Sequence, residues 1–253
     1  MFLKQESFIY FPDRRLTTAP GDAGLPHEEV TLRTEDWLGL GAWWVPAERA
    51  RATVILCHGN AGNISHRLHL IAPLHGLGLN VLAFDYRGYG RSEGRPSEDG
   101  TYRDMDAAIA CALSKGGDSR RLVFFGESLG GAVAVESATR HPCDALVLES
   151  TFTSVPAMAA RHFPWLPSRL LLRIRYDSLS RIGNVGCPVL IMHGPNDEIV
   201  PFSMGRALYQ AASEPKSFAE LAGGHNDGGV ASSPEAFEAL RRFLDRTFGA
   251  QKA

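Results

Sequence analysis

The sequence lacks long apolar runs and has no surplus of basic residues. Near the N-terminus, Lys4, Gln5 and Glu6 interrupt the apolar residues, so this region does not have the continuous apolar length of a signal peptide or a membrane span. The 26 lysines and arginines face 28 aspartates and glutamates, which leaves a net charge of -2. Because binding to a phosphate backbone requires excess positive charge, nucleic acid is not an expected partner. We expect a cytoplasmic protein with no integral membrane segment, and an anchor upstream of this sequence stays open.

Cysteine is scarce, and low-complexity linkers and internal repeats are absent from the sequence. The four cysteines stand singly, without metal-ligand spacing or a dense disulfide pattern: Cys57, Cys111, Cys143 and Cys187. This predicts free thiols, no metal site and no cofactor. Since no stretch rich in Gly, Ser or Pro divides the chain, we predict that residues 1–253 form one domain.

Short apolar runs recur along the chain and are the main indication of its fold. They are Ala52–Cys57, Val81–Phe84, Leu122–Phe125, Ala145–Leu148 and Val189–Met192. Each run is too continuous for a strand with one face in water, so we predict buried parallel strands. Helical patterns lie between them, as in Thr101–Lys115, where one stripe holds Tyr102, Met105, Ile109 and Ala112. Strands that alternate with helices predict an α/β fold.

Two segments depart from this alternation. Glu28–Arg33 and Leu38–Val45 flank a polar turn, which predicts an antiparallel start to the sheet. Residues 151–186 contain no buried strand and carry the apolar and basic sequence WLPSRLLLRIRY, so we predict a short helical, lid-like insertion over the site. Its larger apolar side chains could line an acyl pocket or pack as core: Phe152, Met158, Trp165 and Leu166.

A G-x-S-x-G pattern follows the run Leu122–Phe125 directly. It reads Gly126-Glu127-Ser128-Leu129-Gly130 and leads into the helix-like sequence AVAVESATR. A serine on a sharp turn between a strand and a helix needs small neighbours, which let the backbone bend and expose the hydroxyl. We therefore predict Ser128 as a nucleophile, with the backbone N–H of Leu129 as one donor of an oxyanion hole.

A serine nucleophile requires a base and a carboxylate that orients the base. In strand-turn-helix serine hydrolases both partners follow the serine, the acid before the histidine, on loops after later strands. Of the nine histidines, His225 alone lies in a glycine-flanked loop after the last predicted strand, Ser217–Leu221. His58 and His193 each end a buried strand, and we predict that they bond loop backbone. His225 is therefore the predicted base.

Several carboxylates could serve His225. Asp197 is preferred because it lies a short turn beyond the strand that ends at Met192. Glu198 and Asp227 are weaker candidates, since Asp227 would have to fold back onto the neighbouring imidazole. Glu149 is the main alternative, because it ends the run Ala145–Leu148 and so lies at the edge of the sheet where ligand groups gather.

The second oxyanion donor is expected from the loop His58-Gly59-Asn60-Ala61-Gly62-Asn63, which follows the first buried run. We predict the backbone N–H of Asn60. The glycines of this loop could instead bind phosphate, but the sequence lacks the lysine of a G-x-x-x-x-G-K-S/T motif, which disfavours a nucleotide site.

Five motifs together resemble the α/β-hydrolase superfamily, in particular its serine-aminopeptidase-like and protein-depalmitoylase-like branch. In chain order they are HGNAGN, FDYRGYGRSEG (Phe84–Gly94), GESLGG, HGPNDEIVP (His193–Pro201) and GGHND. The resemblance implies a mostly parallel central sheet with helices on both faces. It also implies a catalytic triad of Ser128, Asp197 and His225. The FDYRGYGRSEG motif would then hold loops beside the site through Asp85, Arg87 and Ser92.

These residues predict hydrolysis of a carboxylic ester or thioester through an acyl-enzyme on Ser128, with a small-molecule or acyl substrate. An aminopeptidase-like peptidase with the same triad is the nearest alternative. A binding protein on a hydrolase fold is the second, because a fold does not guarantee chemistry. The sequence does not indicate an oligomeric state.

Overall fold

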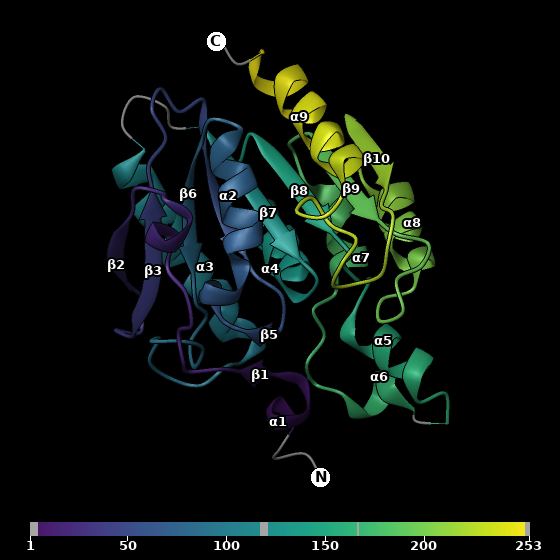
Figure 1. Cartoon of the computed structure of the whole chain (residues 1–253). Helices are drawn as coiled ribbons and strands as arrows, with labels where there is room; N and C mark the ends of the chain where they lie inside the picture. The colour runs from purple at the N-terminus through teal and green to yellow at the C-terminus, as the bar shows by residue number, and fades with distance from the viewer. Residues whose placement is uncertain (1–4, 117–120, 166, 251–253) are drawn as a thin grey trace.

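An eight-stranded sheet forms the centre of the computed structural model, which describes residues 5–116, 121–165 and 167–250 (Figure 1). In spatial order the strands are β10 (Lys216–Glu220), β9 (Val189–His193), β8 (Ala145–Glu149), β7 (Leu122–Glu127), β4 (Ala52–Cys57), β6 (Leu79–Phe84), β3 (Gly39–Val45) and β2 (Glu28–Arg33). From β10 to β6 all neighbours are parallel, whereas β3 pairs antiparallel with both β6 and β2. The predicted sheet, mostly parallel with an antiparallel start, is confirmed.

Helices cover both faces of this sheet (Figure 1). One face packs against α2 (Leu68–Gly76) and α9 (Pro234–Phe248). The other packs against α3 (Glu98–Lys115), α4 (Leu129–Arg140) and α8 (Phe202–Ala211). In β4, Ile55 and Cys57 face the core of α3 and α4, while Val54 and Leu56 face the core of α2 and α9. Burial on both faces is why the strands read as continuous apolar runs.

Helix α3 carries the predicted apolar stripe, since Tyr102, Met105, Ile109 and Ala112 are all buried. It begins three residues before the predicted start at Thr101. The Ser97 side chain caps this earlier turn by accepting a hydrogen bond from the N–H of Gly100 at 3.1 Å.

The insertion at 151–186 is helical, as predicted, and lies at the edge of the sheet where the parallel strands end (Figure 1). It contains α5 (Val155–His162), α6 (Ser168–Leu171), α7 (Ser178–Arg181) and the short 3₁₀ turn Ile182–Asn184. Gln5, just before α1 (Glu6–Ile9), donates to the carbonyl of Leu171 at 2.9 Å and accepts from the N–H of Arg173 at 3.0 Å. The N-terminal segment is therefore bonded to the insertion.

The apolar side chains of the insertion do not share one environment. Phe152 is buried in the core and Met158 packs against it, whereas Trp165 is 78% exposed. Leu166 lies outside the described residues. Core packing thus accounts for two of the four candidates for an acyl pocket, and Trp165 faces solvent.

The minor elements and the cysteines complete the architecture. Strand β1 (Phe11–Pro12) pairs with β5 (Ala61–Gly62) in a separate two-stranded sheet. The four cysteines are free thiols, as predicted, although the sulfur atoms of Cys143 and Cys187 lie 2.9 Å apart.

Among the helices that the structure describes, none combines the length and the apolar character that a membrane span requires.

Candidate active site

Ser128 lies on the sharp turn between β7 and α4, in a backbone conformation that residues with side chains rarely adopt. Its φ is 51° and its ψ is -112°. The N–H of Ser128 donates to the carbonyl of Glu149 at 2.9 Å, and the Thr151 hydroxyl donates to the carbonyl of Ser128 at 2.6 Å. A Cβ atom on Gly126 would lie 2.5 Å from the carbonyl oxygen of Gly130, so the turn requires glycine there. The strained turn presents the hydroxyl at the carboxyl edge of the sheet.

The structure brings the side chains of Ser128, His225 and Asp197 together. Nε2 of His225 lies 3.1 Å from Oγ of Ser128, and Nδ1 lies 2.8 Å from Oδ2 of Asp197. Ser128 and His225 are 97 residues apart in the chain. The three side chains meet because Ser128 follows β7, Asp197 follows β9 and His225 follows β10. The carboxyl ends of these parallel strands lie at one edge of the sheet.

Asp197 is placed to stay ionised. Its Oδ1 accepts hydrogen bonds from the N–H groups of Ile199 at 3.0 Å and Val200 at 2.7 Å, and Oδ2 lies 3.3 Å from Nε2 of His193. Burial alone would raise the pKa of Asp197, but the hydrogen bonds from His193, His225 and Val200 lower that pKa well below its usual value. Such a carboxylate can fix the tautomer of His225 and stabilise its imidazolium form. His193 also donates to the carbonyl of Val200 at 2.9 Å, which is the backbone bond predicted for it.

Glu149, the main alternative acid, is bound to the histidine loop by a different contact. Its Oε2 accepts from the N–H of Val230 at 3.0 Å, and a Cβ atom on Gly229 would collide with its Oε1. Both ring nitrogens of His225 are already engaged, by Asp197 and by Ser128. Burial raises the pKa of Glu149 to about 7. Glu149 therefore supports the loop after β10 and does not bond the imidazole.

The two weaker candidates also bond loop backbone. Oε2 of Glu198 accepts from the N–H of His225 at 3.0 Å, and Oδ1 of Asp227 accepts from the N–H of Gly224 at 2.5 Å. Both carboxylates thus shape the turn that carries His225, and Asp197 is the one that contacts its ring.

The loop after β4 is held beside the nucleophile turn by a residue that the sequence reasoning missed. Oε2 of Glu127 accepts from the N–H of Gly59 at 3.1 Å and lies 2.8 Å from Nε of Arg67. The sequence signal was its position directly before Ser128. The Asn60 side chain bonds the carbonyl of Ile9 and accepts from the Tyr89 hydroxyl at 2.9 Å. The role of the Asn60 N–H as an oxyanion donor stays a prediction.

Leu129 is the first residue of α4, so its N–H lies at a helix N-terminus, where backbone donors have no partner within the helix. The partial positive charge at this end of the helix favours a developing anion. The predicted contribution of Leu129 to an oxyanion hole is consistent with this position and stays a prediction.

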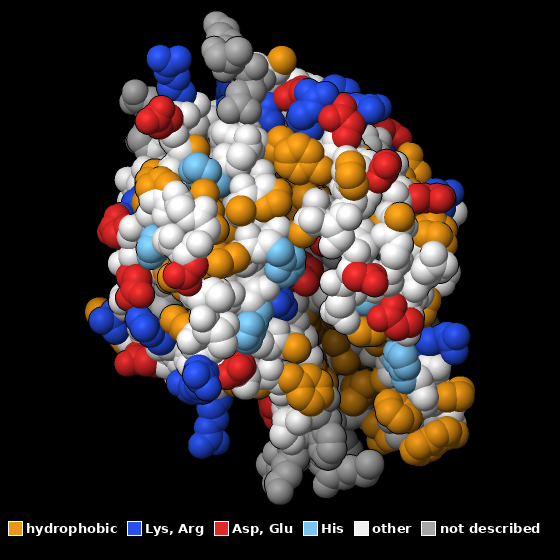
Figure 2. Space-filling view, in the orientation of Figure 1, with side chains coloured by type: hydrophobic (Ala, Val, Ile, Leu, Met, Phe, Trp, Pro, Cys, Tyr) orange, Lys and Arg blue, Asp and Glu red, His pale blue; other side chains and the backbone are white. Residues whose placement is uncertain are grey.

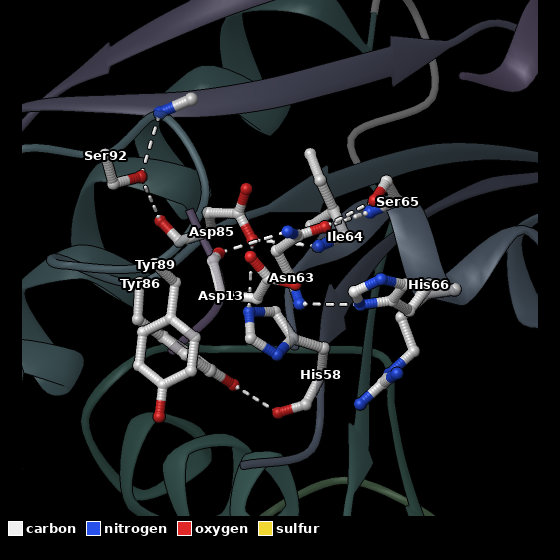
Figure 3. Close-up of polar contacts among 12 residues, drawn as sticks. Asp13, His58, Asn63, Ile64, Ser65, His66, Asp85, Tyr86, Tyr89 and Ser92 are labelled. Atoms are coloured by element: carbon white, nitrogen blue, oxygen red, sulfur yellow. Dashed lines mark hydrogen bonds and ion pairs between the residues drawn. The ribbon is translucent and has the colours of Figure 1, made fainter. Parts of the chain in front are cut away.

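A cluster of buried polar residues also bonds the backbone of the loop after β4 (Figure 3). Oδ1 of Asp85 accepts from the N–H of Ile64 at 2.8 Å and lies 3.5 Å from Nε2 of His58. Ser92 donates to the carbonyl of Asp85 at 2.7 Å, and the Tyr86 hydroxyl donates to the carbonyl of His58 at 3.0 Å. His58 also bonds backbone, as predicted, with Nδ1 at 2.7 Å from the carbonyl of Gly59.

Arg87, the third residue expected to hold loops, joins the same motif to two other parts of the fold. Its guanidinium bonds Asp104 on α3 at 2.8 Å and Asp36, in the turn before β3, at 2.8 Å. Asp85, Arg87 and Ser92 all bond structural partners, as the resemblance implied. Over the described ranges, no group of three or more His, Cys, Asp or Glu side chains is arranged to hold a metal ion.

The chain is similar to proteins of one hydrolase family. The family described as "Serine aminopeptidase, S33" matches residues 48–182. The chain is 43% identical to Uncharacterized protein Rv2307c of Mycobacterium tuberculosis, over 96% of this chain and 88% of that protein. It is 37% identical to Uncharacterized membrane protein YNL320W of Saccharomyces cerevisiae, over 85% and 78%. The solved structure of the Pyrococcus furiosus esterase Pf2001 has the same fold, with a TM-score of 0.80, 24% identity, and coverage of 94% of this chain and 100% of that one. The chain therefore belongs to the serine aminopeptidase S33 family of α/β hydrolases.

Proposed function

We propose that this protein hydrolyses carboxylic esters or thioesters through an acyl-enzyme on Ser128. The observation that carries the proposal is the hydrogen-bonded chain from Oγ of Ser128 through His225 to Asp197, with distances of 3.1 Å and 2.8 Å. A serine hydroxyl becomes a nucleophile at neutral pH when such a base and carboxylate act on it. The fold shared with an esterase adds support without showing the activity.

The chemistry follows from these positions. Nε2 of His225 takes the proton of the Ser128 hydroxyl as Oγ attacks the substrate carbonyl carbon, and the negative charge on the carbonyl oxygen meets the N–H of Leu129 and, as proposed, that of Asn60. The imidazolium then gives its proton to the leaving alkoxide or thiolate, and the acyl group stays on Oγ. A water molecule, deprotonated by His225, then attacks the acyl carbon, the imidazolium returns this proton to Oγ of Ser128 as the ester bond breaks, and the acyl group leaves as a carboxylic acid.

Peptide hydrolysis is the second candidate, because the matching family is described as a serine aminopeptidase. The same triad could attack an amide, but an aminopeptidase must also bind the free amino group of its substrate. Because alkoxides and thiolates are better leaving groups than amines, the proposal predicts that esters and thioesters are hydrolysed faster than amides.

The test is a substrate panel: aryl esters and coenzyme A thioesters from acetyl to palmitoyl, beside aminoacyl anilides of matched leaving-group size. We expect kcat/KM for the best ester or thioester to exceed that for the best anilide by about a hundredfold or more, which corresponds to a difference of about 2.7 kcal/mol in activation free energy. Faster release of amino acids from the anilides would assign the protein as a peptidase.

A further inference from the structure

Two of the four cysteines contact each other at the edge of the sheet opposite the candidate active site. The sulfur atoms of Cys143 and Cys187 lie 2.9 Å apart, although the two residues are 44 positions apart in the chain. Non-bonded heavy atoms in ordinary packing lie about 3.5–4.0 Å apart. The two thiols therefore share a direct S–H···S contact, and a disulfide bond, of about 2.0 Å, requires only a further short approach of the sulfur atoms.

The pairing of two neighbouring strands brings these sulfur atoms together. Cys143 lies two residues before β8, and Cys187 lies two residues before β9. These strands are parallel, with Leu146 opposite Val189, and the N–H of Leu146 donates to the carbonyl of Pro188 at 2.9 Å. Both cysteines thus enter adjacent strands at the amino end of the sheet. A bond between their sulfur atoms requires no change in the pairing of the strands.

The other two cysteines are placed differently. Sγ of Cys57 lies 3.5 Å from Sδ of Met105, a thioether, which cannot form a disulfide. Cys111 lies in α3. Two thiolates supply half of the ligands of a structural zinc site, but no third His, Cys, Asp or Glu within the described ranges joins the Cys143 and Cys187 pair. Oxidation is therefore the chemistry that this pair favours.

We propose that Cys143 and Cys187 are a redox modification site that hydrogen peroxide converts into a disulfide. The Cys143 thiolate, the more exposed of the two sulfurs, attacks a peroxide oxygen. The O–O bond breaks, hydroxide leaves, and Cys143 becomes a sulfenic acid. The Cys187 sulfur then attacks that of Cys143, so that the S–S bond forms, the S–O bond breaks and the oxygen leaves as water. In total the two thiols lose two electrons and two protons, and the peroxide becomes two molecules of water.

The surroundings of Cys143 make this reaction slow. The hydrogen bond with Cys187 and burial raise the pKa of the Cys143 thiol. Because the thiolate is the reactive form, little of Cys143 reacts at neutral pH at any moment. We therefore expect the pair to stay reduced where thiol reductants are abundant and to close under sustained exposure to peroxide.

The disulfide would close a loop that contains β8 and the whole insertion. The insertion is lightly packed, since Pro156 is the one buried residue of the eight in α5. Figure 2 shows hydrophobic side chains gathered over the α5 and α6 region at the lower right, next to a hollow in the surface. Segments with few buried contacts are the first to open. A bond at the base of the insertion restricts the unfolded loop and should therefore stabilise the folded chain.

The experiment is treatment of the full chain with excess hydrogen peroxide, followed by alkylation of the remaining thiols in denaturant and mass measurement of the peptides. We expect a cross-linked peptide pair that contains Cys143 and Cys187, with Cys57 and Cys111 alkylated. The melting temperature should rise by about 5 °C or more and return to its first value after dithiothreitol. Cys143→Ser and Cys187→Ser should each lose the cross-link and the rise. Cys111→Ser, the matched control, should keep both.

Four results would overturn the proposal: treated wild-type protein without the cross-linked peptides, a bond between two chains in place of one within the chain, loss of the cross-link in Cys111→Ser, or a cross-link that leaves the melting temperature unchanged. The disulfide does not depend on the proposed hydrolysis, and it lies at the sheet edge opposite Ser128, so ester turnover should be equal in the reduced and oxidised chains. A cross-link in a chain without ester turnover would contradict the hydrolase assignment alone. Turnover without the cross-link would contradict the redox site alone.

Discussion

Replacing Ser128 with alanine should lower ester turnover by about 10⁶-fold and leave the fold intact. The large loss is expected because no acyl-enzyme can form once Oγ is absent, and residual catalysis would come from the oxyanion donors and from substrate binding. The backbone of the turn is held by bonds that the substitution retains, namely those from the Ser128 N–H to Glu149 and from Thr151 to the Ser128 carbonyl. The measurement is kcat/KM on the best ester, with thermal melting beside it.

Ser114→Ala is the matched control for this variant. Ser114 is an exposed residue of α3, and its hydroxyl donates to the carbonyl of Cys111 within its own helix at 2.8 Å. Turnover should not change in this variant. Near wild-type turnover in Ser128→Ala would remove Ser128 from the mechanism.

Asp197→Asn should lower turnover by about four orders of magnitude, while Glu149→Gln should cost far less. The amide of asparagine cannot supply the negative charge that stabilises the imidazolium of His225, and it can hold the wrong tautomer. Glutamine at position 149 keeps an oxygen that can accept the N–H of Val230. In pH–rate profiles, the limb that reports the catalytic base should change in Asp197→Asn and stay as in the wild type in Glu149→Gln. The reverse ranking of the two variants would assign the catalytic carboxylate to Glu149.

Thermal melting at about pH 5 and about pH 8 serves as the folding control for Glu149→Gln. In the folded protein the pKa of Glu149 is raised from 4.5 to about 7 by burial. The folded state therefore keeps this proton over a range in which the unfolded state loses it, so that the wild type loses stability as the pH rises from 4.5 to about 7. Glutamine does not titrate, so the variant should gain stability relative to the wild type at the higher pH.

The local parts of the site could be predicted because each rests on a short pattern. The turn at Ser128 follows from glycines at fixed offsets between an apolar run and a helix, and the order of Asp197 and His225 follows from their place after successive strands. The alternation of buried runs and amphipathic helices likewise predicted an α/β fold with a buried parallel sheet, because both periodicities are local. The helices on both faces were what the resemblance implied.

The supporting contacts of Glu149 and Glu127 could not be predicted, because they depend on which strands are neighbours. Glu149 reaches the nucleophile turn since β8 pairs with β7 in a register that sets Glu149 opposite Glu127. Its bond to Val230 joins residues 81 positions apart. No short pattern in the sequence specifies that pairing. The same holds for the contact of Glu127 with Gly59, which spans 68 positions.

The environment of the insertion was also ambiguous from sequence. An apolar residue in an irregular segment can be core, pocket or surface, and tertiary packing decides among them. Phe152 lies three residues beyond the end of β8 and packs into the core. Trp165 lies between two prolines beyond α5 and extends into solvent.

The most direct test of the account is covalent labelling of the wild-type chain with a fluorophosphonate, followed by mass measurement of the intact protein and of its peptides. Reaction requires a serine that an adjacent base has activated, so this measurement also distinguishes an enzyme from a binding protein on the same fold. We predict one phosphonyl adduct per chain, located on Ser128 and absent from Ser128→Ala. An unlabelled wild-type chain, or an adduct on another residue, would contradict the assignment of Ser128 as the nucleophile.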